Sequence, residues 1–175
     1  MKIILLAFIL MTGFHLKSVA QDTTGVVSLN YEEFSNRFKS GGFKDADTIQ
    51  LLIIRNSNRQ IFHPAHAANM DLPIGGIYFD YVSQLSQFKN LKELRLIDLF
   101  IKELPENFAE LDKLETLELC FSGTADIKKN LNVLKRLKSL KYLDLNGSRL
   151  SSKQRIMIRK KLSEKGVKVD DVVYL

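Results

Sequence analysis

The chain has 175 residues and a formal net charge of +6, and 45% of its residues are hydrophobic and 26% charged. This composition excludes an intrinsically disordered chain and suits one folded domain with a sizeable core. The single cysteine, Cys120, excludes an intrachain disulfide.

Residues 1–20 have the layout of a secretory signal peptide. Lys2 precedes an apolar run at residues 3–11, and the small residues Ser18 and Ala20 stand three and one before a predicted cut after Ala20. The run is shorter than the roughly 20 residues that a membrane span needs. We therefore expect a secreted, periplasmic or cell-envelope protein, whose mature chain keeps only a mild excess of basic residues.

Residues 21–47 are predicted to form a linker and a capping helix. Tyr31, Phe34 and Phe38 fall on one face of a helix at residues 30–38. We expect that helix to cover the N-terminal end of the core.

A leucine pattern recurs three times in the middle of the chain. Its copies begin at Leu91, Leu114 and Leu140, which are 23 and 26 residues apart, within the range of roughly 20–29 known for one repeat type. The copies read Leu91-x-x-Leu94-x-Leu96, Leu114-x-x-Leu117-x-Leu119 and Leu140-x-x-Leu143-x-Leu145.

The spacing has a physical reason. Leucines two apart in a strand share one face, because side chains alternate along the strand. Between these strands, apolar positions recur at helical or 3₁₀ spacing, as at Ile127, Leu131 and Leu134. Each unit is too small to bury its own apolar face, so stacked units must share one core.

Residues 88–150 resemble a leucine-rich repeat of the small secreted bacterial type. The segments Phe88-Lys-Asn-Leu-Lys-Glu-Leu-Arg-Leu and Leu104-Pro-Glu-Asn-Phe-Ala-Glu-Leu match its pattern closely. The resemblance implies an α/β fold: a right-handed solenoid with a short parallel sheet on its concave face, helices and turns on its convex face, and helical caps. It implies protein binding and no catalysis. The family's usual turn asparagine is replaced by Leu99, Ser122 and Ser148.

The repeats are predicted to span residues 48–150, with an earlier and less regular copy at Ile49-x-x-Leu52-x-Ile54. Ile49 lies 42 residues before Leu91, and the stretch at about 56–76 has no clear period. Either one repeat holds an insertion there, or two degenerate repeats fill the interval. Loops of this length are uncommon and often functional, which favours the insertion.

Residues 151–175 are predicted to form a C-terminal capping helix and an edge strand. Ser151 or Ser152 can cap a helix that runs to about Lys165, and Gly166 provides a stop. The strand is predicted from Val167, Val169 and Val173.

The strand positions that alternate with the leucines are predicted to form a protein-binding face. Arg95, Glu118 and Asp144 should lie side by side, with Arg95 pairing with Glu118 and Asp144 left free. Aromatic and arginine side chains favour an interface, although an ordinary solvated sheet needs no partner. The predicted binding residues are Glu93, Arg95, Ile97, Thr116, Glu118, Cys120, Phe121, Tyr142, Asp144 and Asn146.

The sequence favours a binding module over an enzyme. His63 and His66 are too few for a zinc site, which needs three or four ligands. No signature of a thiol nucleophile surrounds Cys120, and the glycine pairs lack the rest of a phosphate loop. We expect no catalytic residue, no metal, no cofactor and no small-molecule substrate.

The final predicted helix is strongly basic. It could meet a peripheral anionic surface, which gives an alternative function as an envelope or cell-surface adhesion protein, or it could be a solvated helix. We expect a monomer with a protein partner and no nucleic acid, because no aromatic stacking pattern accompanies the charges. Its bases are Lys153, Arg155, Arg159, Lys160, Lys161 and Lys165.

Overall fold

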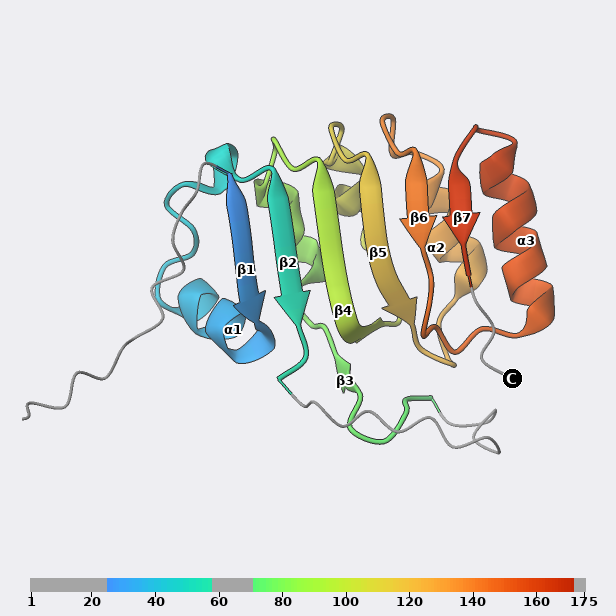
Figure 1. The fold of residues 1–175 in the computed structure, drawn as a ribbon, viewed down its shortest axis with the longest axis horizontal. Coiled ribbons are helices and arrows are strands. Elements are labelled where there is room, and N and C mark those ends of the chain that lie inside the picture. Colours follow the sequence, from blue (N-terminus) through green and yellow to red (C-terminus); the bar gives the residue numbers. More distant parts are fainter. Residues whose placement is uncertain (1–24, 58–70, 172–175) are drawn as a thin grey trace, which may run out of the picture.

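A computed structural model describes residues 25–57 and 71–171 of the chain (Figure 1). The predicted signal peptide, His63, His66 and Val173 lie outside the described residues. Within the described ranges, no helix is long and apolar enough to cross a membrane.

The described chain is organised around one parallel sheet. Six strands follow one another in chain order across it: β1 (Val26–Asn30), β2 (Leu51–Arg55), β4 (Glu93–Ile101), β5 (Thr116–Phe121), β6 (Tyr142–Asp144) and β7 (Lys168–Asp170). The short strand β3 (Ile77–Tyr78) pairs with the far end of β4. The predicted α/β class with a parallel sheet is therefore confirmed.

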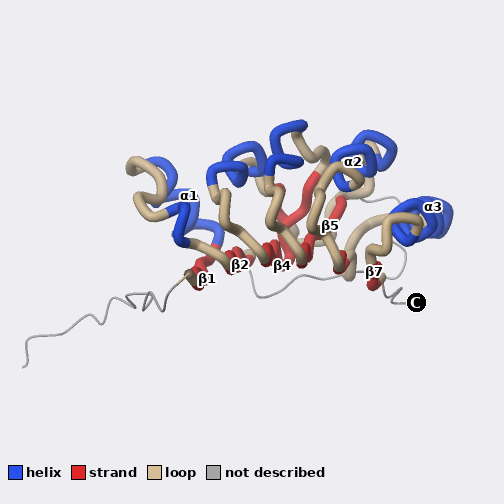
Figure 2. The backbone as a smooth tube through the Cα atoms, turned by 90° about the horizontal axis from the view of Figure 1, so that it is seen from above, coloured by secondary structure: helices blue, strands red, loops and turns tan. Residues whose placement is uncertain are grey.

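The segments between strands return on one side of the sheet (Figure 2). Among the described residues, the other side carries no helix, and we call it the open face. The return segments are α1 (Tyr31–Lys39), the 3₁₀ helices at Ala46–Thr48, Val82–Gln87 and Glu106–Glu110, α2 (Ile127–Leu134) and α3 (Ser152–Ser163).

Strand register places the repeated leucines in line. Leu52, Leu94, Leu117 and Leu143 are successive partners across β2, β4, β5 and β6, and each is fully buried. Val27 on β1 and Val169 on β7 extend this row at both ends. The row confirms the predicted phase of the three leucine motifs, and its burial supplies the main driving force for stacking the units.

Strand β1 corrects the prediction that residues 21–47 hold only a linker and a helix. Val27 and Leu29 point into the core, while Val26 and Ser28 are exposed. Helix α1 follows β1 directly, because Asn30 caps it: the Asn30 side chain accepts from the Glu33 amide at 2.8 Å. Helix α1 is thus the return segment of a first unit, and β1 is the edge strand of the sheet.

Between β2 and β4 the described residues add no further strand to the main path. β2 bonds directly with β4, and β3 lies off that path. Asn56, just after β2, is bonded to the segment just before β3, since its side-chain amide donates to the Gly75 carbonyl at 2.9 Å. Asp71, a few residues before Gly75, accepts from the Thr124 amide at 2.8 Å and so contacts the loop after β5.

Helix α3 leads into the last strand. Ser151 is its N-cap, in a capping box with Gln154, and Ile158 and Leu162 are buried. Gly166 has a φ of 77°, a left-handed conformation that favours glycine at the end of a helix. β7 then pairs with β6 and forms the second edge of the sheet.

Candidate functional site: the open face of the sheet

Two rows of side chains cross the open face, because neighbouring parallel strands are in register. The first row is Val26, Leu51, Glu93, Thr116, Tyr142 and Lys168, and the second is Ser28, Ile53, Arg95, Glu118, Asp144 and Asp170. All twelve residues are exposed or half-buried, whereas their chain neighbours on β1, β2, β4, β5 and β6 that point the other way are buried. Six of the ten predicted binding residues belong to these rows, which is the juxtaposition that the alternation rule predicts.

The other four predicted residues lie outside the two rows. Ile97 is half-buried next to Arg55 of β2, in a partial third row, and Asn146 follows the end of β6. Phe121 is fully buried in the core, so the prediction that it adds aromatic area to the binding face is wrong.

Cys120, the fourth, is also covered: only 5% of it is exposed, and its thiol donates to the Asn146 carbonyl at 3.1 Å. Cys120 therefore does not offer a contact surface, which corrects a second predicted residue. The physical reason is an irregularity in β4. The register of β4 with β5 shifts between Arg95 and Phe100, and Asp98 has a positive φ of 57°. The regular open face consequently ends at the Glu118 row.

Arg95 is held mainly by Glu93, a contact that the sequence did not predict. Its Nε lies 2.6 Å from Glu93 Oε1 and 3.9 Å from Glu118 Oε2. The predicted pair of Arg95 with Glu118 is thus the longer of two contacts. Asp144 is not free as predicted, because its Oδ1 accepts from the Asn146 amide at 2.7 Å.

Glu118 is a half-buried carboxylate of the open face. Burial raises its pKa, and the neighbouring charge of Asp144 raises it further, while Arg95 opposes both effects. The ionised form of Glu118 is therefore destabilised in the protein without a partner.

Tyr142 is fixed at the C-terminal side of the face. Its hydroxyl donates to Asp170 Oδ2 at 2.7 Å, which, with burial, raises the pKa of Tyr142 to about 12. Lys168 Nζ lies 5.4 Å from the centre of the Tyr142 ring, within the range of a cation–π contact. A ring held in this way loses little entropy when a partner packs on it.

Cys120 is poorly suited to act as a nucleophile. Burial raises the pKa of the Cys120 thiol to about 12, so the thiolate needed for nucleophilic attack is scarce at neutral pH. Among the described residues, no group of three or more His, Cys, Asp or Glu side chains is placed to hold a metal ion.

Sequence reasoning missed the N-terminal part of the open face. Val26, Leu51 and Ile53 give it an apolar patch, and Val26 is 41% exposed. These positions could have been found from the alternation in Val26–Asn30 and Leu51–Arg55, since each strand places its other apolar side chains in the core. At the opposite edge, Lys168 and Asp170 were missed although the strand that carries them was predicted.

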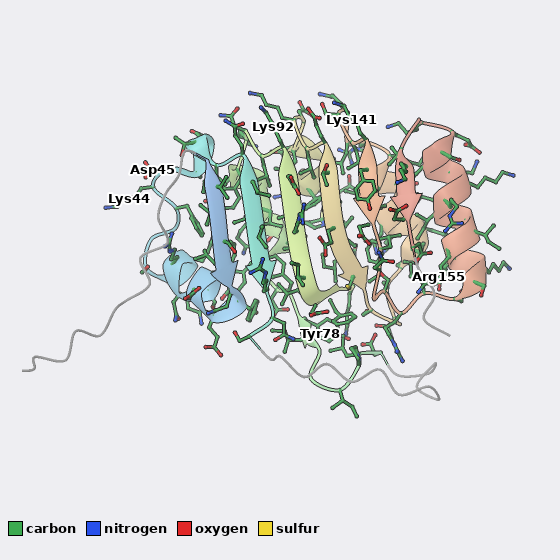
Figure 3. The ribbon with its side chains drawn as sticks, in the orientation of Figure 1. Lys44, Asp45, Tyr78, Lys92, Lys141 and Arg155 are labelled. Atoms are coloured by element: carbon green, nitrogen blue, oxygen red, sulfur yellow. The ribbon has the colours of Figure 1, made fainter. Side chains whose placement is uncertain are left out.

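A hollow of about 710 Å³ lies beside the start of β1 and β2. Arg37, Lys44, Lys92 and Lys113 line it together with Asp45 and Asp47. Lys44 extends from the left of the ribbon and Lys92 from the top, so these two bases point in different directions (Figure 3). Because Asp45 and Asp47 lie among the bases, the lining of the hollow is of mixed charge.

The basic helix α3 withdraws one of its six predicted bases, Arg155, from solvent. Arg155 pairs with Asp171 and donates to the Ser148 carbonyl, Lys161 pairs with Glu164, and Lys165 donates to the Lys135 carbonyl. Lys153, Arg159, Lys160 and Lys165 are exposed, and Lys161 is half-buried. The helix therefore presents most of its predicted charge to solvent.

Comparison with known proteins gives a likeness among the solved structures, and none to a family model or a curated protein. A leucine-rich-repeat protein of Leptospira interrogans is similar over 70% of this chain, with 22% sequence identity and a TM-score of 0.44. The chain spans about a quarter of the length of that protein, 25%.

Proposed function

We propose that this chain is a short leucine-rich-repeat solenoid that binds a protein partner through its open face and catalyses no reaction. The observation that carries the proposal is the pair of in-register rows, which sets apolar, aromatic and charged side chains on one helix-free surface. Enrichment in aromatic and arginine side chains is typical of protein interfaces. Tyr142 and Arg95 are the anchors that we expect to matter most.

The backbone supports the surface rigidly. The turn entering each strand repeats the same bonds: Lys92 N donates to Gln50 O, Glu115 N to Lys92 O, and Lys141 N to Glu115 O, each at 2.8 Å. A surface preorganised in this way loses less entropy on binding than a loop would. Helix α3 and strand β1 close the two ends of the solenoid in this proposal, and the signal peptide directs the protein out of the cytoplasm.

Adhesion through helix α3 is the alternative, and it rests on the exposed bases Lys153, Arg159, Lys160 and Lys165. The pairing of the largely covered Arg155 with Asp171 removes one base from that surface. Attraction between an exposed helix and an anionic surface would be strongly screened by salt.

The test is affinity capture with three immobilised proteins: the native chain, an open-face variant carrying Arg95→Glu and Tyr142→Ala, and a helix variant carrying Arg159→Ser and Lys160→Ser. We expect a partner that the native chain and the helix variant hold and that the folded open-face variant loses. A partner that is lost only by the helix variant would support adhesion, and a partner held equally by all three would exclude both surfaces.

A further inference from the structure

The open face is acidic on a chain that is basic. Its two rows hold four acids, Glu93, Glu118, Asp144 and Asp170, and two bases, Arg95 and Lys168. The adjoining Arg55 and Asp98 add one charge of each sign. The whole chain, in contrast, carries a net charge of +6. The negative charge of the face is therefore a local feature and does not follow from the overall composition.

The charges within the face are unevenly compensated. Arg95 is drawn toward Glu93, as its 2.6 Å and 3.9 Å contacts with Glu93 and Glu118 show. At the other edge, Lys168 Nζ lies 3.6 Å from Asp170 Oδ2. Glu118 and Asp144 lie between these pairs, on adjacent strands. Glu118 has only the longer, 3.9 Å contact with Arg95, and no ion pair with Asp144 is seen among the described residues. Like charges on neighbouring strands destabilise the free protein.

The opposite part of the face is apolar. Leu51, Ile53 and Val26 are half-buried or exposed there, with no charged side chain on the first two strands of these rows. Strands lie about 4.8 Å apart, so β2 is roughly 12 Å from the space between β5 and β6. An extended peptide crosses that distance in about four residues, and a helix in about eight.

Resting on the proposed function, we infer that the partner presents a cationic segment: a lysine or arginine that inserts between Glu118 and Asp144, and an apolar side chain that covers Leu51 and Ile53. A guanidinium can donate to both carboxylates at once, because its donors form a planar fork. Its arrival would remove the repulsion between the two acids, so binding and relief of an unfavourable charge pair coincide.

The test uses a phage library of random 12-residue peptides selected on the full chain. Selected peptides are then titrated against the native chain, the charge variant Glu118→Gln/Asp144→Asn and the apolar variant Leu51→Gln/Ile53→Gln. The amide that replaces the Asp144 carboxylate keeps an acceptor oxygen for the Asn146 amide, so the charge variant removes charge and leaves hydrogen bonding. Thermal melts establish that each variant is folded.

We expect the selected peptides to be rich in lysine or arginine and to bind the charge variant at least tenfold more weakly, and the apolar variant more weakly as well. Selected peptides that lack basic residues, or that bind the charge variant as tightly as the native chain, would overturn the cationic partner. If such peptides still bound the apolar variant more weakly, the open face would remain the binding surface. Peptides that ignore both variants, or no enrichment at all, would overturn the proposed function too.

A second copy of the chain is a further outcome, since α3 is itself basic. Sedimentation of the native chain and the charge variant separates this case. A native dimer that becomes a monomer in the charge variant would assign the acidic pair to self-association and overturn the separate partner. A monomer in both the native chain and the charge variant would support a separate cationic partner.

Discussion

Individual polar residues either stabilise or destabilise the fold of this protein, and Asn130 and Glu118 illustrate the two cases. Glu118 is half-exposed on the open face, and its ionised form is disfavoured by burial and by Asp144. Asn130 is fully buried on α2, yet its amide is satisfied: Leu104 N donates to its Oδ1 at 2.6 Å, and its Nδ2 donates to the Lys102 carbonyl at 2.9 Å. The hydrogen bonds of Asn130 stabilise the folded state, whereas the ionised carboxylate of Glu118 destabilises it.

Glu118→Gln is expected to stabilise the protein in a pH-dependent way. The pKa of Glu118 is raised in the folded state, so ionisation costs stability as pH rises through that pKa and costs nothing below the unfolded value. Thermal melts should show a gain of about 0.5 kcal/mol near neutral pH and almost none below about pH 4. Glu103→Gln, at an exposed position, controls for the loss of one negative charge. Equal effects at both pH values would contradict the argument.

Asn130→Ala is expected to destabilise the protein by about 2–3 kcal/mol, because it leaves the buried Leu104 amide and the partly buried Lys102 carbonyl without partners. The measurement is urea denaturation at neutral pH. Asn90→Ala is the control, since Asn90 bonds to Asp47 O and Lys113 at an exposed position, and we expect less than about 1 kcal/mol there. A cost for Asn130→Ala no larger than for Asn90→Ala would show that the bridge is unimportant.

At the scale of elements, strand alternation decides which side chains are structural. Leu117 occupies the centre of the buried row and is 0% exposed, while its neighbour Thr116 is half-buried on the open face. We expect Leu117→Ala to cost about 2–5 kcal/mol through lost burial and a cavity, and Thr116→Ala to cost less than about 1 kcal/mol. Denaturation midpoints check the pair, and equal costs would mean that the register described for β5 is wrong.

The elements also show how far a sequence can predict this fold. The leucine phase, the return segments and most of the open face follow from periodicities of two and of three to four residues. Strand β1 was missed because Val26–Asn30 lacks the leucine motif. The burial of Cys120 and Phe121 could not be predicted, because it depends on the β4 irregularity at Asp98 and on register with a distant segment. The Arg155–Asp171 pair likewise depends on tertiary packing.

At the scale of the whole molecule, the two sides of the sheet differ in what covers them. The return segments bury the leucine rows and supply stability, while the described parts of the chain place no helix on the opposite surface (Figures 1 and 2). Such a division lets the outward residues vary with little cost to folding, which is a general property of stacked repeats. The acidic open face on a basic chain is a global asymmetry that favours oriented encounter with a cationic partner.

The central claim, that the open face is the binding surface, is tested most directly with a fluorescent reporter. The chain has no tryptophan, so Thr116→Trp places a single indole in the first row of the open face, and Ile156→Trp places one on α3, where Ile156 is 68% exposed. Each variant is titrated with a tryptophan-free peptide selected on the native chain. The account predicts a blue-shifted emission for Thr116→Trp and no change for Ile156→Trp. A shift in Ile156→Trp with none in Thr116→Trp would contradict it.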